Sequence, residues 1–212
     1  MLTALDALDR LRAGNRRFVA QKPERQVPMG PAPNVDAGQT PFAVVLGCSD
    51  SRVPVEIVFD QGMGDLFVIR VAGNIVAPSQ IGSVEFAAER FGTPLVVVLG
   101  HTLCGAVQAT LEQLQQPTAH QSRNLRSIVD RIRPAVESLL VPELEHDLEA
   151  LTRHAVRANV RVAANYLRHG SETLERLIES GKLLVVGAEY SLETGAVDFF
   201  EGLSTEPSGA AE

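Results

Sequence analysis

Two cysteines and one histidine have the types and spacing that a catalytic zinc ion needs. The chain has 212 residues and two cysteines, Cys48 and Cys104, and His101 stands three residues before the second cysteine. This His-x-x-Cys spacing puts two donors on one short turn, and the distant Cys48 then closes the site. Two thiolates and an imidazole, with a fourth position for water or substrate, form a known catalytic zinc arrangement. The three residues therefore predict one Zn²⁺ per subunit.

An acid and an arginine follow the first cysteine closely. Asp50 is two residues from Cys48, so its carboxylate can reach the metal or stop just short of it, and Arg52 can clamp it in a bidentate pair. With Asp50 held off, zinc carries a water whose pKa falls toward neutrality. Three plainer interpretations stay open: cysteines that only pack in a core, a closed structural zinc with Asp50 as fourth ligand, and a solvated ion pair.

Both metal motifs come at the ends of apolar runs. Cys48 directly follows residues 41–47, and His101 directly follows residues 95–100. Continuous apolar runs of this length are typical of strands buried on both faces of a parallel sheet. Ligands of such sheets bind beyond the carboxyl ends of the strands. The three side chains can therefore converge if these two strands are neighbours.

The rest of the chain alternates strands and helices, which predicts an α/β fold. Further strands are expected at 66–71, 182–188 and 196–200, and helices at 2–20, 78–91, 103–114, 124–140, 143–168 and 171–180. We expect a mostly parallel central sheet of four strands plus an antiparallel edge strand, flanked by helices, with an N-terminal helical arm. The expected organisation is one domain over residues 1–202, with the arm and a proline-rich linker at 1–40, and a flexible tail at 203–212.

Composition narrows the class of protein. The net charge is −7, from 19 Lys and Arg against 26 Asp and Glu, which disfavours nucleic acid as a partner. No apolar stretch has the length that crosses a bilayer, so no membrane partner is expected. The start of the chain carries charges and lacks the apolar core of a secretory signal. We therefore expect a cytoplasmic protein, in which the two cysteines stay reduced.

At these residues the sequence resembles the β-class carbonic anhydrases, of bacterial and plant-like type. Residues 48–53, Cys-Ser-Asp-Ser-Arg-Val, match the first metal motif of that family, and residues 100–105, Gly-His-Thr-Leu-Cys-Gly, resemble the second. The likeness extends through residues 11–18, 67–74 and 193–195, and it is weakest in the proline-rich linker and in residues 117–170. The resemblance implies a lyase that interconverts carbon dioxide and bicarbonate by zinc-bound hydroxide. It implies Cys48, His101 and Cys104 as ligands, Asp50 and Arg52 as a catalytic dyad, and a homodimer or homotetramer with the site near the subunit interface.

The resemblance also implies residues of the substrate pocket. Gln39 has the position of a glutamine that reaches the partner's pocket, Phe67 and Phe86 would form an apolar wall, and Gly105, with Gly73, would allow close backbone approach at the rim. Gln39 can equally be a linker residue, and the two phenylalanines can be plain core. A second branch of the family carries a tryptophan three residues before the first cysteine. Here that residue is Val45, so we expect the open form, with Asp50 paired to Arg52.

Two other functions stay open. The same fold and zinc site could hydrolyse carbon disulfide or carbonyl sulfide, depending on access to the pocket. The protein could also be a non-catalytic dimer that zinc only stabilises. The Asp50–Arg52 pair favours catalysis, since a structural site has no need of a displaceable acid.

Overall fold

The computed structural model describes residues 2–21, 38–116, 122–141 and 147–203. Its centre is one five-stranded sheet in the order β2-β1-β3-β4-β5. The strands are β1 (Ala43–Gly47), β2 (Leu66–Arg70), β3 (Leu95–His101), β4 (Leu184–Tyr190) and β5 (Val197–Glu201). The first four are parallel, and β5 pairs with β4 antiparallel. The predicted sheet is therefore confirmed, including its antiparallel edge strand.

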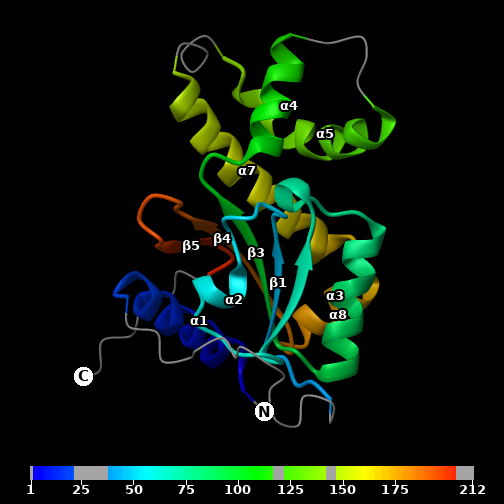
Figure 1. Ribbon diagram of the computed structural model, residues 1–212. Helices are drawn as coiled ribbons and strands as arrows, with labels where there is room; N and C mark the ends of the chain where they lie inside the picture. The colour runs from blue at the N-terminus through cyan, green and yellow to red at the C-terminus, as the bar shows by residue number, and fades with distance from the viewer. Residues whose placement is uncertain (1, 22–37, 117–121, 142–146, 204–212) are drawn as a thin grey trace, which may run out of the picture.

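Helices cover both faces of the sheet, as Figure 1 shows. Because successive strand residues point to opposite faces, Val45 and Val97 pack with α1 (Ala4–Val19) and α2 (Val55–Val58). Their neighbours Val44 and Val96 pack on the opposite side, where α3, α7 and α8 lie. These helices span Pro78–Phe91, Leu148–His169 and Glu172–Glu179. Burial on both sides explains why the strands are continuous apolar runs.

A third group of helices stands beyond the carboxyl ends of the strands, at the top of Figure 1. It consists of α4 (Gly105–Gln115), α5 (Arg123–Val136), the 3₁₀ turn η3 (Glu137–Leu139) and the first half of α7. Its apolar cluster is separate from the two sheet cores and contains both cysteines. The end of the sheet that carries the predicted metal motifs is thus roofed by helices.

Local signals explain where several helices begin and end. Thr3 and Asp6 form a reciprocal capping box at the start of α1. Helix α3 has Pro78 at its first turn and ends at Gly92, whose φ of 65° suits glycine. Ser171 caps α8 by accepting a hydrogen bond from the N–H of Leu174.

Some predicted boundaries were wrong. The helix expected from residue 103 begins at Gly105, because Leu103 adopts φ +56° and Cys104 is the N-cap. The helix expected at 124–140 ends as α5 at Val136, and a 3₁₀ turn follows. The short α2 and the 3₁₀ turn η2 (Ala72–Asn74) were not predicted. The expected helix start at 143, most of the linker and the tail beyond 203 lie outside the described residues.

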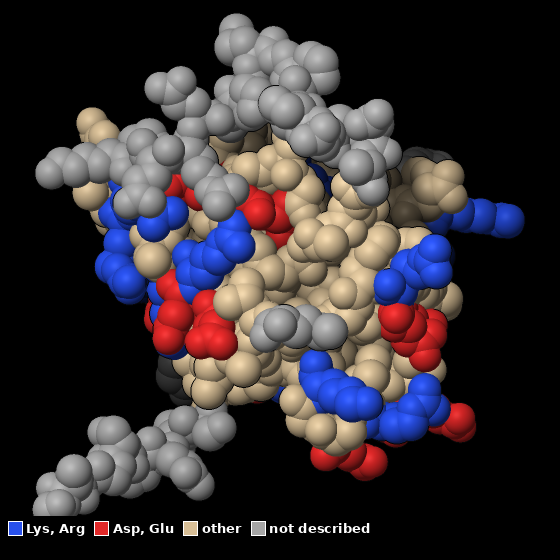
Figure 2. Space-filling model, turned by 90° about the horizontal axis from the view of Figure 1, so that it is seen from below, with Lys and Arg blue, Asp and Glu red and all other residues tan. Residues whose placement is uncertain are grey.

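The opposite end of the sheet, seen in Figure 2, has uncharged atoms over its middle and charged side chains toward its rim. A mostly apolar hollow of about 440 Å³ lies there, lined among others by Leu2, Pro94, Leu177 and Lys182. None of the predicted site residues lines it. Across the described residues, no helix combines the length and the apolar character that a bilayer span requires.

Candidate metal centre

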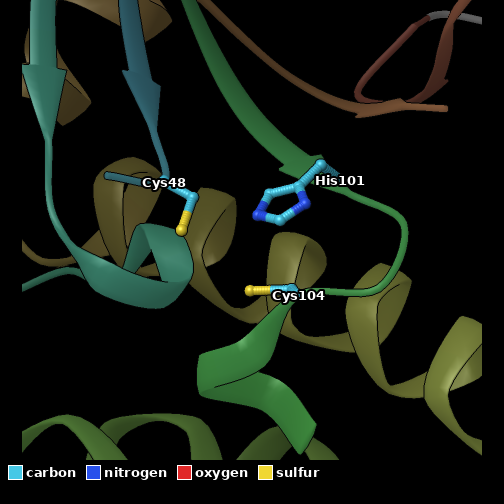
Figure 3. A group of neighbouring side chains, drawn as sticks. All are labelled: Cys48, His101 and Cys104. Carbon is cyan, nitrogen blue, oxygen red and sulfur yellow. The ribbon is translucent and has the colours of Figure 1, made fainter. Parts of the chain in front are cut away.

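Cys48, His101 and Cys104 converge at the carboxyl edge of the sheet. Strands β1 and β3 are neighbours, and their register pairs Gly47 with Leu99, so the residues that follow emerge side by side. One ligand atom from each of the three side chains lies within 4.8 Å of the others, and all three residues are buried. Figure 3 shows the side chains turned toward one common space. Two sulfurs and an imidazole at this separation suit a divalent ion such as zinc.

The His101 imidazole has a defined orientation. Its Nδ1 lies 2.9 Å from the carbonyl oxygen of Thr102. A carbonyl oxygen only accepts, so Nδ1 carries the proton and Nε2 presents its lone pair. Nε2 is fully buried and has no hydrogen-bond partner among the described residues. An unpaired buried acceptor is costly, which is the condition that a bound cation would relieve.

Of the two thiols, Cys48 ionises more readily than Cys104. A hydrogen bond with Cys104 lowers the pKa of Cys48, burial opposes this shift, and the Gly73 N–H reinforces it. The same hydrogen bond and burial raise the pKa of Cys104. The Gly73 N–H donates to the Cys48 sulfur over 3.3 Å. Cys48 is therefore the more acidic of the two thiols, and its thiolate is the form that binds metals.

Asp50 is held beside these donors by Arg52. The Arg52 backbone N–H and Nε both donate to Asp50 Oδ1, each over 2.9 Å, and Nη2 donates to Oδ2 over 2.8 Å. Hydrogen bonding from Arg52 keeps the pKa of Asp50 well below its usual range, so the carboxylate is ionised. Asp50 Oδ2 remains 3.8 Å from His101 Nε2. The acid thus lies at the edge of the donor cluster while its charge is paired with arginine.

Arg70 is a site residue that sequence reasoning missed. From the end of β2, its Nε donates to the Cys48 carbonyl over 3.0 Å and its Nη2 donates to the Asp50 carbonyl over 2.6 Å. These two bonds fix the backbone that carries both the cysteine and the acid. In the sequence, Arg70 stands out only as a charged residue at the end of an otherwise apolar strand. Its hydrogen-bond partners depend on β2 lying beside β1.

The loop at Gly73 packs tightly beneath Cys48. Gly73 has φ +68°, and a Cβ there would lie 2.7 Å from Ile132 Cδ1 and 3.1 Å from Ala106 Cβ. The buried Asn159 side chain donates to the Gly73 carbonyl over 2.8 Å. The expected close approach at Gly73 is present. At Gly105, by contrast, a Cβ would meet no atom of the described chain within 4 Å.

Gly105 directly follows Cys104, but the other predicted pocket residues lie away from the metal centre. Gln39 is exposed and precedes β1, whereas Cys48 follows β1, so the two lie at opposite ends of the strand. Phe67 pairs with Val44, about 13 Å along the strand from Cys48. Phe67 contacts Phe86 and Phe91 in an aromatic cluster with centroids 5.5 to 6.2 Å apart. None of these side chains can line the metal centre of its own chain. Val45 is fully buried on the α1 side of the sheet.

Comparison with known proteins places the fold and the motifs in one family. A family model described as carbonic anhydrase matches residues 43–197. Carbonic anhydrase 2 of Mycobacterium tuberculosis strain H37Rv is 39% identical over 191 residues, covering 87% of each chain. A carbonic anhydrase of Mycolicibacterium smegmatis is 38% identical over 195 residues, covering 89% of each chain. A solved β-carbonic anhydrase of Aspergillus fumigatus is 26% identical, with a TM-score of 0.70 over 93% of this chain and 90% of that chain.

The chain therefore belongs to the carbonic anhydrase family, and its fold is that of the β class. It is an enzyme of that family. Family membership together with the Cys-His-Cys cluster supports hydration of carbon dioxide assisted by a metal ion.

Proposed function

We propose that the protein interconverts carbon dioxide and bicarbonate with one zinc ion held by Cys48, His101 and Cys104. The observation that carries the proposal is the set of three soft donors within 4.8 Å, beside a carboxylate that arginine holds aside. Two thiolates and an imidazole favour zinc over the hard cations calcium and magnesium. A bound zinc ion supplies a Lewis acid that lowers the pKa of a coordinated water to near 7.

In this proposal Asp50 orients the attacking water. Asp50 is ionised and can only accept hydrogen bonds, and Oδ2 faces the donor cluster. Arg52 fills the other side of the carboxylate with a two-point contact, which keeps Asp50 from becoming a ligand itself. Arg70 holds the same loop from β2. Arg52 and Arg70 thus fix where Asp50 lies, and Arg52 keeps the Asp50 carboxylate ionised. A closed structural zinc site would need neither feature.

Replacing Arg52 with lysine tests the pairing. Lysine keeps the charge but cannot make the parallel two-point contact, so Asp50 is free to turn toward the metal. We expect kcat/KM for carbon dioxide hydration to fall about 10- to 100-fold while zinc content stays at one per chain. Stopped-flow hydration with a pH indicator measures the rate. Arg133→Lys, in a pair with Asp130 on the surface of α5, is the matched control and should keep the wild-type rate.

The same assay decides between the remaining functions. Full activity in Arg52→Lys would contradict the role given to the pair. A zinc-loaded wild type that does not accelerate hydration would overturn the proposed function. Turnover of carbonyl sulfide or carbon disulfide in place of carbon dioxide would then favour a hydrolase, and inertness toward all three would favour a zinc-stabilised dimer.

We further propose a homodimer in which each chain supplies pocket residues to the other. A homotetramer would be a pair of such dimers. Among the described residues, the edge strand β2 pairs on one side only, and Phe86, 53% exposed, lies over it with Phe67 and Phe91. Gln39 and Phe67 cannot reach the metal centre of their own chain. A second copy docked on β2 would bring its own set to that centre. A solved Sordaria macrospora relative that shares the fold, with a TM-score of 0.70, is described as tetrameric.

Charge at Phe86 should weaken this association. A buried glutamate has no partner in an aromatic cluster, so we expect Phe86→Glu to raise the dimer dissociation constant by at least about 30-fold. Sedimentation velocity over a concentration series measures it. Leu125→Glu, at an exposed residue of α5, should leave the dimer intact. A wild type that sediments as a monomer at every concentration would contradict the proposal.

The compartment proposed is the cytoplasm. Cys48 and Cys104 are free thiols in the structure, and a reducing compartment keeps such a pair available for metal.

A further inference from the structure

The orientation of His101 depends on one neighbouring carbonyl. His101 Nδ1 donates to the carbonyl oxygen of Thr102 over 2.9 Å, and this bond turns Nε2 toward the two sulfurs. The acceptor belongs to the next residue in the chain, so it can orient the ring only if Thr102 is itself fixed.

Thr102 is held by the turn that joins β4 to β5. Its backbone N–H donates to the Tyr190 carbonyl over 3.0 Å. Its hydroxyl Oγ1 accepts from the Leu192 N–H, also over 3.0 Å. The N–H and the hydroxyl of Thr102 therefore bond to β4 and the turn after it, and its carbonyl oxygen accepts from His101 Nδ1.

The chain after Thr102 offers no comparable support. Leu103 has φ +56°, an unfavourable conformation for leucine, and its side chain is 53% exposed. The turn is needed because Cys104 must come back to the side of His101. A strained, half-exposed residue cannot anchor the Thr102 carbonyl, so the hairpin contacts must.

The hairpin is in turn tied to α1. The buried Asn15 side chain donates to the Gly195 carbonyl over 2.9 Å and accepts from the Val197 N–H over 2.9 Å. It also donates to the Val58 carbonyl over 3.1 Å. Hydrogen bonds therefore tie α1 to the hairpin, and others tie the hairpin to Thr102, which in turn bonds to His101.

We propose that Thr102 is a positioning residue for His101, and that its hydroxyl, anchored on the β4–β5 hairpin, sets the direction of Nε2. This inference rests on the proposed function, in which His101 binds zinc. Metal-ligating histidines commonly have their second nitrogen fixed in this way, and loss of that support weakens metal binding. Here the Thr102 carbonyl fixes the second nitrogen of His101, and the Thr102 hydroxyl in turn fixes that carbonyl by its bond to the Leu192 N–H.

Valine and serine at position 102 separate the hydroxyl from the size of the side chain. Thr102→Val keeps the shape but leaves the Leu192 N–H without its acceptor, whereas Thr102→Ser keeps the acceptor. We expect Thr102→Val to raise the zinc dissociation constant about 10- to 100-fold in chelator competition. We also expect it to shift the visible bands of the cobalt-substituted protein. Thr102→Ser should bind zinc within about threefold of wild type and show the wild-type cobalt spectrum.

A second threonine serves as the control for general loss of stability. Thr93 is buried at the other end of the sheet, where its hydroxyl donates to the Pro41 carbonyl over 3.0 Å. Thr93→Val should lower the melting temperature but leave zinc affinity and the cobalt spectrum unchanged.

Three results would overturn the proposal. One is wild-type zinc affinity with a wild-type cobalt spectrum in Thr102→Val, which would leave the proposed function standing. Another is a Thr102→Ser protein with weakened zinc binding and altered cobalt bands, a result that counts even if Thr102→Val fails to fold. The last is a wild type that takes up neither zinc nor cobalt, which would also remove the proposed function.

Discussion

Replacing Cys104 with serine is expected to abolish zinc binding and carbon dioxide hydration together. A serine hydroxyl stays protonated at neutral pH and is a far poorer ligand than a thiolate, so two donors would remain where three converge. Loss of an outer contact to a metal ligand costs about 10- to 100-fold in affinity, and loss of a ligand should cost far more. Elemental analysis of the purified variant measures the zinc, and stopped-flow hydration measures the activity, which should fall to the rate of the buffer.

The chain offers a matched pair of histidines as a control. His101→Ala should lose zinc and activity in the same way as Cys104→Ser. His154→Ala removes an exposed histidine of α7 and should keep both. Far-UV circular dichroism shows that each variant is folded. Stoichiometric zinc with full activity in Cys104→Ser would contradict the assignment of Cys104 as a ligand.

Gly14→Ala is expected to destabilise the protein strongly, although it lies in a helix. A Cβ at Gly14 would lie 1.8 Å from the Phe59 carbonyl oxygen and 2.8 Å from its carbonyl carbon. These are backbone atoms and cannot rotate away, so α1 would have to move off α2 and strain the contacts of Asn15. We expect the free energy of unfolding to fall by about 3 kcal/mol. Urea denaturation followed by circular dichroism measures it.

Gly82→Ala is expected to raise the free energy of unfolding. Gly82 lies in α3, is exposed, and a Cβ there would meet no atom of the described chain within 4 Å. Alanine is a better helix former than glycine, so this variant should be more stable by about 0.5 to 1 kcal/mol. If Gly14→Ala proved as stable as Gly82→Ala, the packing of α1 against the Phe59 backbone would be wrong.

The strands, and the placement of both metal motifs at one edge of the sheet, could be predicted because they follow from simple constraints. A strand buried on both faces, such as Ala43–Gly47, needs a continuous apolar run. The carboxyl ends of neighbouring parallel strands meet at one edge, which brings Cys48 to His101. The types and spacing of the residues are enough to place the strands and the two metal motifs.

The supports of the site could not be predicted because they depend on which strands are neighbours. Arg70 acts on the Cys48 loop because β2 lies beside β1, and Thr102 is anchored by Leu192 because β4 lies beside β3. Local sequence patterns do not show the order of the strands in a sheet. The one-turn helix α2 is too short to show a period, and the left-handed turn at Leu103 occurs at a residue that disfavours it.

The pocket residues mark a different limit. Phe67 and Phe86 were expected in the apolar wall of the pocket and Gln39 in the pocket of the partner subunit, and in the described chain all three lie away from the metal centre. For the two phenylalanines, the sequence alone does not say which subunit's site they complete. The proposed dimer would reconcile these positions with the expectation.

X-ray absorption at the zinc edge of the purified wild-type protein tests whether the two cysteines and His101 hold the metal. We expect one zinc per chain with two sulfur donors at about 2.3 Å and nitrogen or oxygen donors at about 2.0 to 2.1 Å. A protein free of zinc, or a zinc shell without sulfur, would contradict it.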